Sequence, residues 1–196
     1  MRRLRALLLV TICLAMPAFG HHGELQRASR ELDGWAVASF NLIDQQGRPL
    51  TQERLRGRWT FMLFGDTTGC AECCNAALSA LAGLSKRIER AELMQTTQVV
   101  FVSLDPQRDT PARLREYLTA FDPRFVGGTG TPSMLHRLAD EMGVKTALSP
   151  TAAIEQPDGC GSLLLVGPDA TIRAEYLPPF DVPRLTSAYI RMRQGR

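Results

Sequence analysis

Three short apolar runs constrain the fold of this chain more than any other feature of its sequence. They are residues 58–65 (RWTFMLFG), 98–105 (QVVFVSLD) and 162–167 (SLLLVG). Each run has the length of one strand and is nearly continuous, whereas a strand with one solvated face alternates apolar and polar residues. The runs therefore predict strands that are buried on both faces of a sheet, and such a sheet needs helices on both of its faces.

The segments between and after these runs have the residue spacing of amphipathic helices. Apolar residues recur at intervals of three or four, and two Thr-Pro pairs each supply an N-cap followed by a first-turn proline. The predicted helices run from about residue 74 to 90, from Thr110, from Thr131, and from Asp181 to about Arg193.

Turn residues complete this pattern. A short hairpin is predicted around Gly47, and the turn PDATI (168–172) leads the third apolar run into an antiparallel strand, IRAEY (172–176). The sequence thus predicts one α/β domain with a central mixed β-sheet flanked by helices on both faces.

The first twenty residues have the pattern of an export signal. A basic start is followed by an apolar run that ends in small residues at Ala18 and Gly20. We therefore divide the chain into a signal peptide (1–20), an N-terminal leader (21–34) and a folded domain (35–196). Export predicts a periplasmic or otherwise extracytoplasmic location, with membrane association only if the N-terminal segment is not cleaved.

The charge of the chain excludes one class of partner. The chain has 23 Lys and Arg residues against 20 Asp and Glu residues, and three of the arginines lie in the predicted signal peptide. The remaining residues are balanced in charge and contain no Lys/Arg-rich segment. We therefore expect no nucleic-acid partner, because such binding requires a concentrated positive surface.

Three cysteines lie within five residues directly after the first predicted buried strand. The segment GDTTGCAECCNAAL (65–78) places Cys70, Cys73 and Cys74 where a strand turns into a helix. The positive end of the helix dipole stabilises thiolates at such a place. Cys70 and Cys74 are four residues apart, so on a helix they share one face and can bind one ion or each other. Cys73 competes with Cys74 as the partner of Cys70.

These thiols fit more than one chemistry. Exported proteins keep cysteines as thiols only when they are metallated, actively reduced or paired, so a role as small core hydrophobes is the weaker interpretation. Soft thiolates favour Cu(I) or Zn(II), and a CxxC spacing also fits a redox disulfide. Together with Cys160, the three cysteines also allow three pairings as static disulfides in a binding module.

Longer stretches of the chain resemble the Sco/SenC family, the thioredoxin-fold copper chaperones that serve assembly of cytochrome c oxidase. The similarity is strongest over VVFVSLDPQRDTPARLREYLTAFDPRFVGGTGTP (99–132), and FNLIDQQGRPLTQERLRGRWTFMLFG (40–65) agrees nearly as well. It extends from about Trp35 to the end of the chain. The resemblance implies a thioredoxin-like fold, a copper cofactor, and a partner that is a cytochrome c oxidase subunit or another periplasmic copper or thiol protein.

The resemblance also implies a site. In the family, a CxxxC pair and a distant histidine bind one copper ion, and the two cysteines also cycle to a disulfide. Matching residues make Cys70 and Cys74 the pair and Cys73 an added thiol, while Gly159 stands at the histidine position. The turn before the first cysteine is one residue longer than usual, and Asn75 replaces the proline that follows the second.

The missing histidine leaves three candidates for a third copper ligand. Cys160 is our first choice because it is adjacent to the lost position. Cys73 is a second candidate from inside the motif, and His21 with His22, at the predicted mature N-terminus, is a third.

Two functions follow from these residues. The first is an exported copper-binding chaperone for oxidase assembly that uses Cys70, Cys74 and Cys160. The alternative is a thiol-disulfide oxidoreductase without copper, in which Cys70 attacks a partner disulfide and Cys74 or Cys73 resolves the intermediate.

The loop DPQRDTP (105–111) adds charged residues at the end of the second buried strand. Sheet-and-helix folds usually place functional sites at this edge. The resemblance implies a structural or partner-facing role near the cysteines for Asp105, Arg108 and Asp109. The alternative is that Arg108 and Asp109 only shape the start of the next helix.

Overall fold

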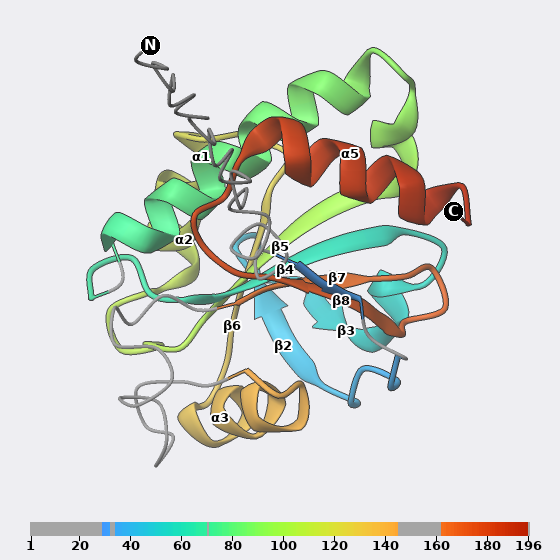
Figure 1. Ribbon diagram of the computed structural model, residues 1–196. Coiled ribbons are helices and arrows are strands. Elements are labelled where there is room, and N and C mark those ends of the chain that lie inside the picture. Colours follow the sequence, from blue (N-terminus) through green and yellow to red (C-terminus); the bar gives the residue numbers. More distant parts are fainter. Residues whose placement is uncertain (1–28, 32–33, 70, 145–161, 196) are drawn as a thin grey trace, which may run out of the picture.

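The structure is a computed structural model, and it describes residues 29–31, 34–69, 71–144 and 162–195 (Figure 1). The strands are β1 (Ser29–Glu31), β2 (Asn41–Asp44), β3 (Pro49–Thr51), β4 (Trp59–Gly65), β5 (Thr97–Ser103), β6 (Val126–Thr129), β7 (Leu163–Val166) and β8 (Ile172–Tyr176). The α-helices are α1 (Ala71–Glu89), α2 (Pro111–Thr119), α3 (Pro132–Glu141) and α5 (Val182–Arg193). Two 3-10 helices are η1 (Gln52–Leu55) and η2 (Leu93–Thr96).

The described strands form one mixed sheet in the order β1-β8-β7-β4-β5-β6-β2-β3. Strands β4, β5 and β6 run parallel, and the remaining neighbours pair antiparallel. The three apolar runs of the sequence are β4, β5 and β7, which lie side by side in the middle of this sheet. Their prediction as buried strands is confirmed, because nearly all of their residues are buried.

Helices cover both faces of the sheet (Figure 1). Phe61 and Leu63 of β4 belong to a core that also contains residues of α1, α2 and α5. Met62 and Phe64, which point the other way, belong to a second core with α3 and the β2–β3 hairpin. Successive residues of a strand point to opposite faces, so one continuous apolar run supplies both cores. The predicted α/β class and its mixed sheet with helices on both faces are confirmed.

The predicted helix starts are confirmed with one shift. Thr110, Thr131 and Asp181 each cap a helix, with the side chain accepting a hydrogen bond from the backbone N–H three residues later. Helix α1 begins at Ala71, three residues earlier than its apolar spacing indicated. The first turn of α1 therefore includes Cys73.

Strand β6 is not predicted by the sequence, because two of its four residues are glycines, which are depleted in strands. A Cβ on Gly127 would lie 2.8 Å from Cδ1 of Leu118 in α2, and a Cβ on Gly128 would lie 2.6 Å from Cδ2 of Leu50 in β3. Glycine thus lets α2 and the hairpin approach β6 closely from its two faces.

The predicted signal peptide (1–20) and all of the predicted leader except residues 29–31 and 34 lie outside the described residues. The division of the chain at residues 20 and 34 stays a prediction. Within the described part of the chain, no helix has the length and apolar character needed to cross a membrane.

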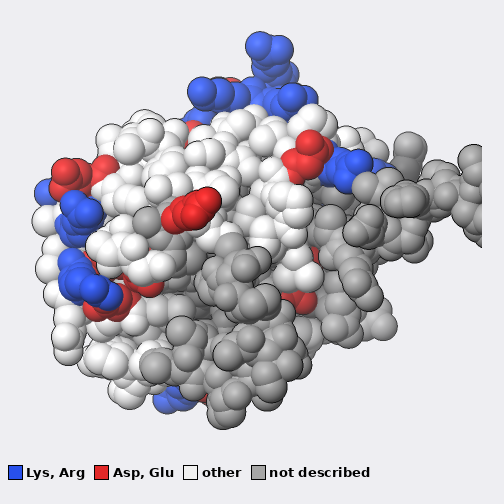
Figure 2. Space-filling view, turned by 60° about the vertical axis from the view of Figure 1, so that its left-hand side comes forward, with Lys and Arg blue, Asp and Glu red and all other residues white. Residues whose placement is uncertain are grey.

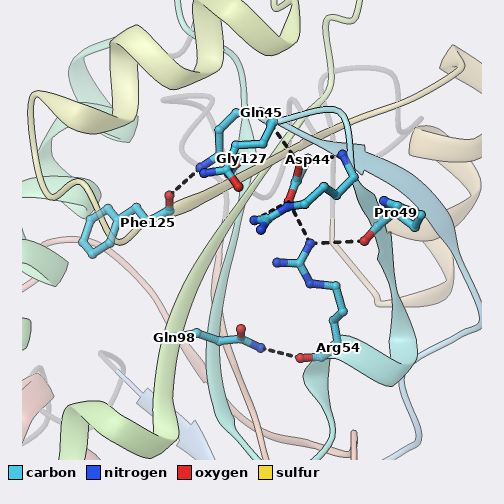
Figure 3. A network of polar contacts seen from close by, with 9 residues as sticks. Asp44, Gln45, Pro49, Arg54, Gln98, Phe125 and Gly127 are labelled. Atoms are coloured by element: carbon cyan, nitrogen blue, oxygen red, sulfur yellow. Dashed lines mark hydrogen bonds and ion pairs between the residues drawn. The ribbon is translucent and has the colours of Figure 1, made fainter.

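A polar network joins the β2–β3 hairpin to η1 and to the start of β6 (Figure 3). The buried Asp44 carboxylate accepts hydrogen bonds from Arg54 at 2.8 Å and from Arg48 Nε at 3.0 Å. Gln45 donates to the carbonyl of Phe125 and accepts from the N–H of Gly127. Burial alone would raise the pKa of Asp44, but the hydrogen bonds from Arg54, Arg48 and nearby backbone N–H groups together lower this pKa to about 2.

Asp44→Asn is expected to make the free energy of unfolding depend less on pH in the acid range. The pKa of Asp44 falls from an ordinary value of 3.8 to about 2 on folding. Its stabilisation is therefore complete above pH 3.8 and is lost as the pH falls toward 2. Solvent screens the charge of Arg48, which is largely exposed, so we expect ionised Asp44 to add only about 1–2 kcal/mol to the free energy of unfolding.

Urea unfolding at pH 7 and near pH 2.5 measures this contribution. The matched control is Glu116→Gln, because Glu116 pairs with Arg113 on the surface at 3.9 Å. The control should follow the wild-type pH profile. An Asp44→Asn variant that also follows it would contradict the prediction.

Candidate cysteine site

The cysteine segment lies at the carboxyl edge of the parallel strands. β4 ends at Gly65 beside the end of β5 at Ser103, and the chain reaches α1 after a turn over residues 66–69. The N–H of Leu104 donates to the carbonyl of Gly65 at 2.8 Å, which holds the two strand ends together. Helix α1 therefore presents its N-terminal, positive end at this edge.

The two described cysteines have different surroundings. Cys74 is 1% exposed and belongs to the core beneath α1, together with Ala77 and Leu78. Cys73 is half-buried and is disulfide-bonded, and the other cysteine of this bond lies outside the described residues. Adjacent residues on a helix are about 100° apart, so the two side chains leave the helix in different directions.

The turn before α1 is organised by Asp66. Its carboxylate accepts hydrogen bonds from the N–H of Thr68 at 2.9 Å and from the N–H of Gly69. The hydroxyl of Thr68 donates to the same oxygen at 3.3 Å. This is an Asx-type turn, for which Asp-x-x-Gly is a typical sequence. Asp66 is not among the residues that the sequence analysis singles out, although DTTG is a typical sequence for such a turn.

Asp109 is completely buried and supports the same turn from the neighbouring loop. Its carboxylate accepts hydrogen bonds from the N–H of Thr67 at 3.1 Å, from the hydroxyl of Thr67 at 2.6 Å and from the hydroxyl of Ser103 at 2.7 Å. The cap of α2 is Thr110 instead. Asp109 thus lies near the cysteine segment, as the resemblance implies, and its contacts extend beyond the start of α2.

Asp105 and Arg108 form a separate pair at the surface. The guanidinium of Arg108 donates to the Asp105 carboxylate and lowers the pKa of that carboxyl. The N–H of Asp105 also donates to the hydroxyl of Ser103 at 3.1 Å. The backbone of Asp105, but not its ion pair, is therefore joined through Ser103 to the hydrogen bonds of Asp109.

Asn75 connects α1 to α2 directly after the cysteines. The hydroxyl of Tyr117 donates to Oδ1 of Asn75 at 2.7 Å. The Tyr117 ring also contacts the rings of Phe101 and Phe121. A proline at position 75 has no side-chain oxygen, so this contact is specific to the residue found here.

The structure does not test the predicted ligand set. Cys70, Gly159, Cys160, His21 and His22 all lie outside the described residues. Among the residues that the structure does describe, no group of three or more His, Cys, Asp or Glu side chains is arranged to hold a metal ion. The assignment of Cys70, Cys74 and Cys160 as ligands, and of Cys70 with Cys74 or Cys73 as a redox pair, stays a prediction.

Figure 2 shows the side of the molecule on which α1 begins. The described surface in this view is mostly uncharged, and most Lys, Arg, Asp and Glu side chains lie along its edges.

Comparisons with known proteins agree with this fold. Residues 30–192 match the family described as SCO1/SenC. A Stutzerimonas stutzeri protein named "Putative copper-binding protein" is 33% identical over 151 residues, which span 76% of this chain and 73% of that protein. The bovine "Protein SCO2 homolog, mitochondrial" is 30% identical over 128 residues, which span 64% of this chain but only 48% of that protein.

Solved structures give the same result. Arabidopsis thaliana ScoI, crystallised with copper bound, has a TM-score of 0.69 and 28% identity, over 82% of this chain and 99% of that chain. Yeast Sco1 with copper bound has a TM-score of 0.70 over 82% of this chain and 90% of that chain. Its identity of 24% supports the fold alone. With its family match, its mixed sheet and its cysteines at the start of α1, this chain belongs to the SCO1/SenC family and has the thioredoxin-like fold.

Proposed function

We propose that this protein is an exported copper-binding chaperone that acts in assembly of the copper site of cytochrome c oxidase. The observation that carries the proposal is the position of the cysteines, in and beside the first turn of α1 at the carboxyl edge of β4 and β5. The relatives named or crystallised as copper-binding proteins support copper as the metal.

The donor chemistry fits copper as cargo. Cys74 lies in the first turn of α1 with its side chain 1% exposed, and Cys70 precedes it by four residues in the sequence. Thiolates are soft ligands and select Cu(I) over hard cations. Cys160 is the proposed third ligand, because the sequence resemblance aligns its neighbour Gly159 with the family's histidine. Copper bound in this way would be passed on to the acceptor.

The acceptor is proposed to be a cytochrome c oxidase subunit or another periplasmic copper or thiol protein. The N-terminal export pattern supports a periplasmic location, and retention of residues 1–20 would attach the protein to the membrane. The described surface in Figure 2 carries few charged side chains away from its edges, which suits contact with another protein.

Titration of the fully reduced protein with Cu(I) tests the proposal. We expect one Cu(I) per chain, held tightly enough to compete with a chromophoric Cu(I) chelator, and protection of the ligating thiols from alkylation. A reduced protein that leaves all Cu(I) with the chelator would contradict copper handling.

The disulfide-bonded state of Cys73 favours a second candidate, a thiol-disulfide oxidoreductase. In this reaction the Cys70 thiolate attacks a partner disulfide, forming a mixed disulfide and releasing one partner thiolate. A thiolate of Cys73 or Cys74 then attacks the Cys70 sulfur and releases the second partner thiolate. The partner gains two electrons, and the protein becomes an intramolecular disulfide.

Removal of the resolving thiol is expected to trap the partner. A Cys73→Ser, Cys74→Ser double variant keeps Cys70, so it should accumulate a mixed disulfide that is visible on a non-reducing gel and lost with reductant. The Cys70→Ser variant is the matched control and should trap nothing. Equal amounts of mixed disulfide in the two variants would contradict the oxidoreductase mechanism.

A further inference from the structure

Asp109 is a buried carboxylate without a described ion-pair partner. Its exposed fraction is 0%, and among the ion pairs of the described residues none involves it. Its neighbour Arg108 pairs with Asp105 instead. An ionised carboxylate in such a place is costly unless hydrogen bonds replace its lost water. The stability of the Asp109 carboxylate in this buried place therefore depends on the hydrogen-bond donors that surround it.

These donors come from two segments that are distant in sequence. Thr67, in the turn before α1, contributes both its N–H and its hydroxyl, and Ser103, at the end of β5, contributes a hydroxyl. Thr67 is 6% exposed and Ser103 is 0% exposed, so solvent cannot easily replace either donor. Hydrogen bonds to a charged acceptor are stronger than neutral ones, and two bonds to Thr67 fix both its backbone and its side chain.

We infer that Asp109 is a positioning residue for the cysteine segment and that it acts through Thr67. In the turn over residues 66–69, Asp109 holds Thr67 and Asp66 holds the residues that follow. The chain leaves this turn directly into the cysteines. This inference rests on the proposed function, because it assigns Asp109 a role in the chemistry of those thiols.

Loosening this turn should weaken any chemistry that needs the thiols in one arrangement. A preorganised set of ligands binds a metal more tightly than a mobile set, because less conformational entropy is lost on binding. The equilibrium between dithiol and disulfide depends on the same arrangement. Asp109 does not need to touch the metal or a sulfur to affect either property.

Thr67→Val and Thr67→Ser form the matched pair that tests the inference. Valine has the shape of threonine but lacks the hydroxyl donor, whereas serine keeps it. We expect Thr67→Val and Asp109→Ala to weaken Cu(I) affinity about tenfold in chelator competition. Thr67→Ser should stay within about twofold of wild type. The ratio of reduced to oxidised protein in a glutathione buffer should shift in the same two variants.

Asp44→Asn separates positioning from stability. Asp44 is also a fully buried carboxylate, but it lies in the β2–β3 hairpin network and does not contact the turn before α1. This control should lower the urea midpoint without changing Cu(I) affinity or the glutathione equilibrium. If Thr67→Val and Asp109→Ala behave like the control, Asp109 is only structural and the inference is wrong.

The two proposals can fail separately. A wild-type protein that binds no Cu(I) contradicts copper handling, and the glutathione equilibrium of the Thr67 pair then decides the positioning role alone. A wild-type protein that binds Cu(I) as tightly as Thr67→Val, with the same glutathione equilibrium, contradicts only the positioning role.

Discussion

Cys70→Ser and Cys74→Ser are each expected to weaken Cu(I) binding by about a hundredfold or more, equivalent to about 2.8 kcal/mol. Serine replaces a soft sulfur donor with a hydroxyl that binds Cu(I) poorly. Cys73→Ser should keep the one-to-one complex, because the family pattern makes Cys73 the added thiol. Competition between each reduced variant and a chromophoric Cu(I) chelator measures the three affinities.

The buried position of Cys74 requires a folding control. Its side chain is 1% exposed in the core beneath α1, so serine there places a hydroxyl among apolar neighbours. Thermal unfolding of the apo-protein separates a folding defect from a ligand defect, and Cys74→Ala supplies a second variant without the polar group.

Cys160→Ser tests the third ligand in the same experiment. It should weaken Cu(I) binding if Cys160 replaces the family's histidine. An unchanged Cu(I) complex in both Cys70→Ser and Cys160→Ser would show that the predicted site is wrong.

Gly159→His is expected to strengthen Cu(II) binding by about a hundredfold. The substitution places an imidazole at the position that the resemblance aligns with the family's ligand histidine. Imidazole suits Cu(II), whereas a site made of thiolates alone favours Cu(I). Equilibrium titration with Cu(II), followed by the sulfur-to-copper charge-transfer absorption, measures the gain.

Gly159→Ala is the control for this substitution, because it removes the glycine without adding a ligand. It should bind Cu(II) like wild type. If Gly159→His and Gly159→Ala bind Cu(II) equally, either the alignment of residue 159 with the family's histidine or the role of Cys70 and Cys74 is wrong.

Much of the fold follows from local patterns in the sequence. The apolar runs predict β4, β5 and β7 because burial on both faces requires continuous apolar residues. Thr110 and Thr131 mark α2 and α3 because a capping side chain followed by proline is a local device. β6 escapes prediction, since its glycines are required by the close approach of α2 and β3 and not by any strand propensity.

The candidate site is less completely encoded in local patterns. The spacing of Cys70, Cys73 and Cys74 identifies the segment, but spacing cannot predict that the Cys74 side chain lies in the core while Cys73 is disulfide-bonded. Both cysteines lie in the first turn of one helix. The packing of α1 on the sheet decides which of them turns inward.

The family, the central strands, the capped helices and the cysteine cluster can all be predicted from the sequence, because each depends on neighbouring residues or on their periodicity. The support that Asp109 gives to the turn before the cysteines becomes visible only in the folded chain. Thr67 and Asp109 are 42 residues apart, and their contact exists only because β4 and β5 run parallel and end at the same edge. A carboxylate that looks in sequence like part of a helix start is therefore buried against the turn that precedes the cysteines.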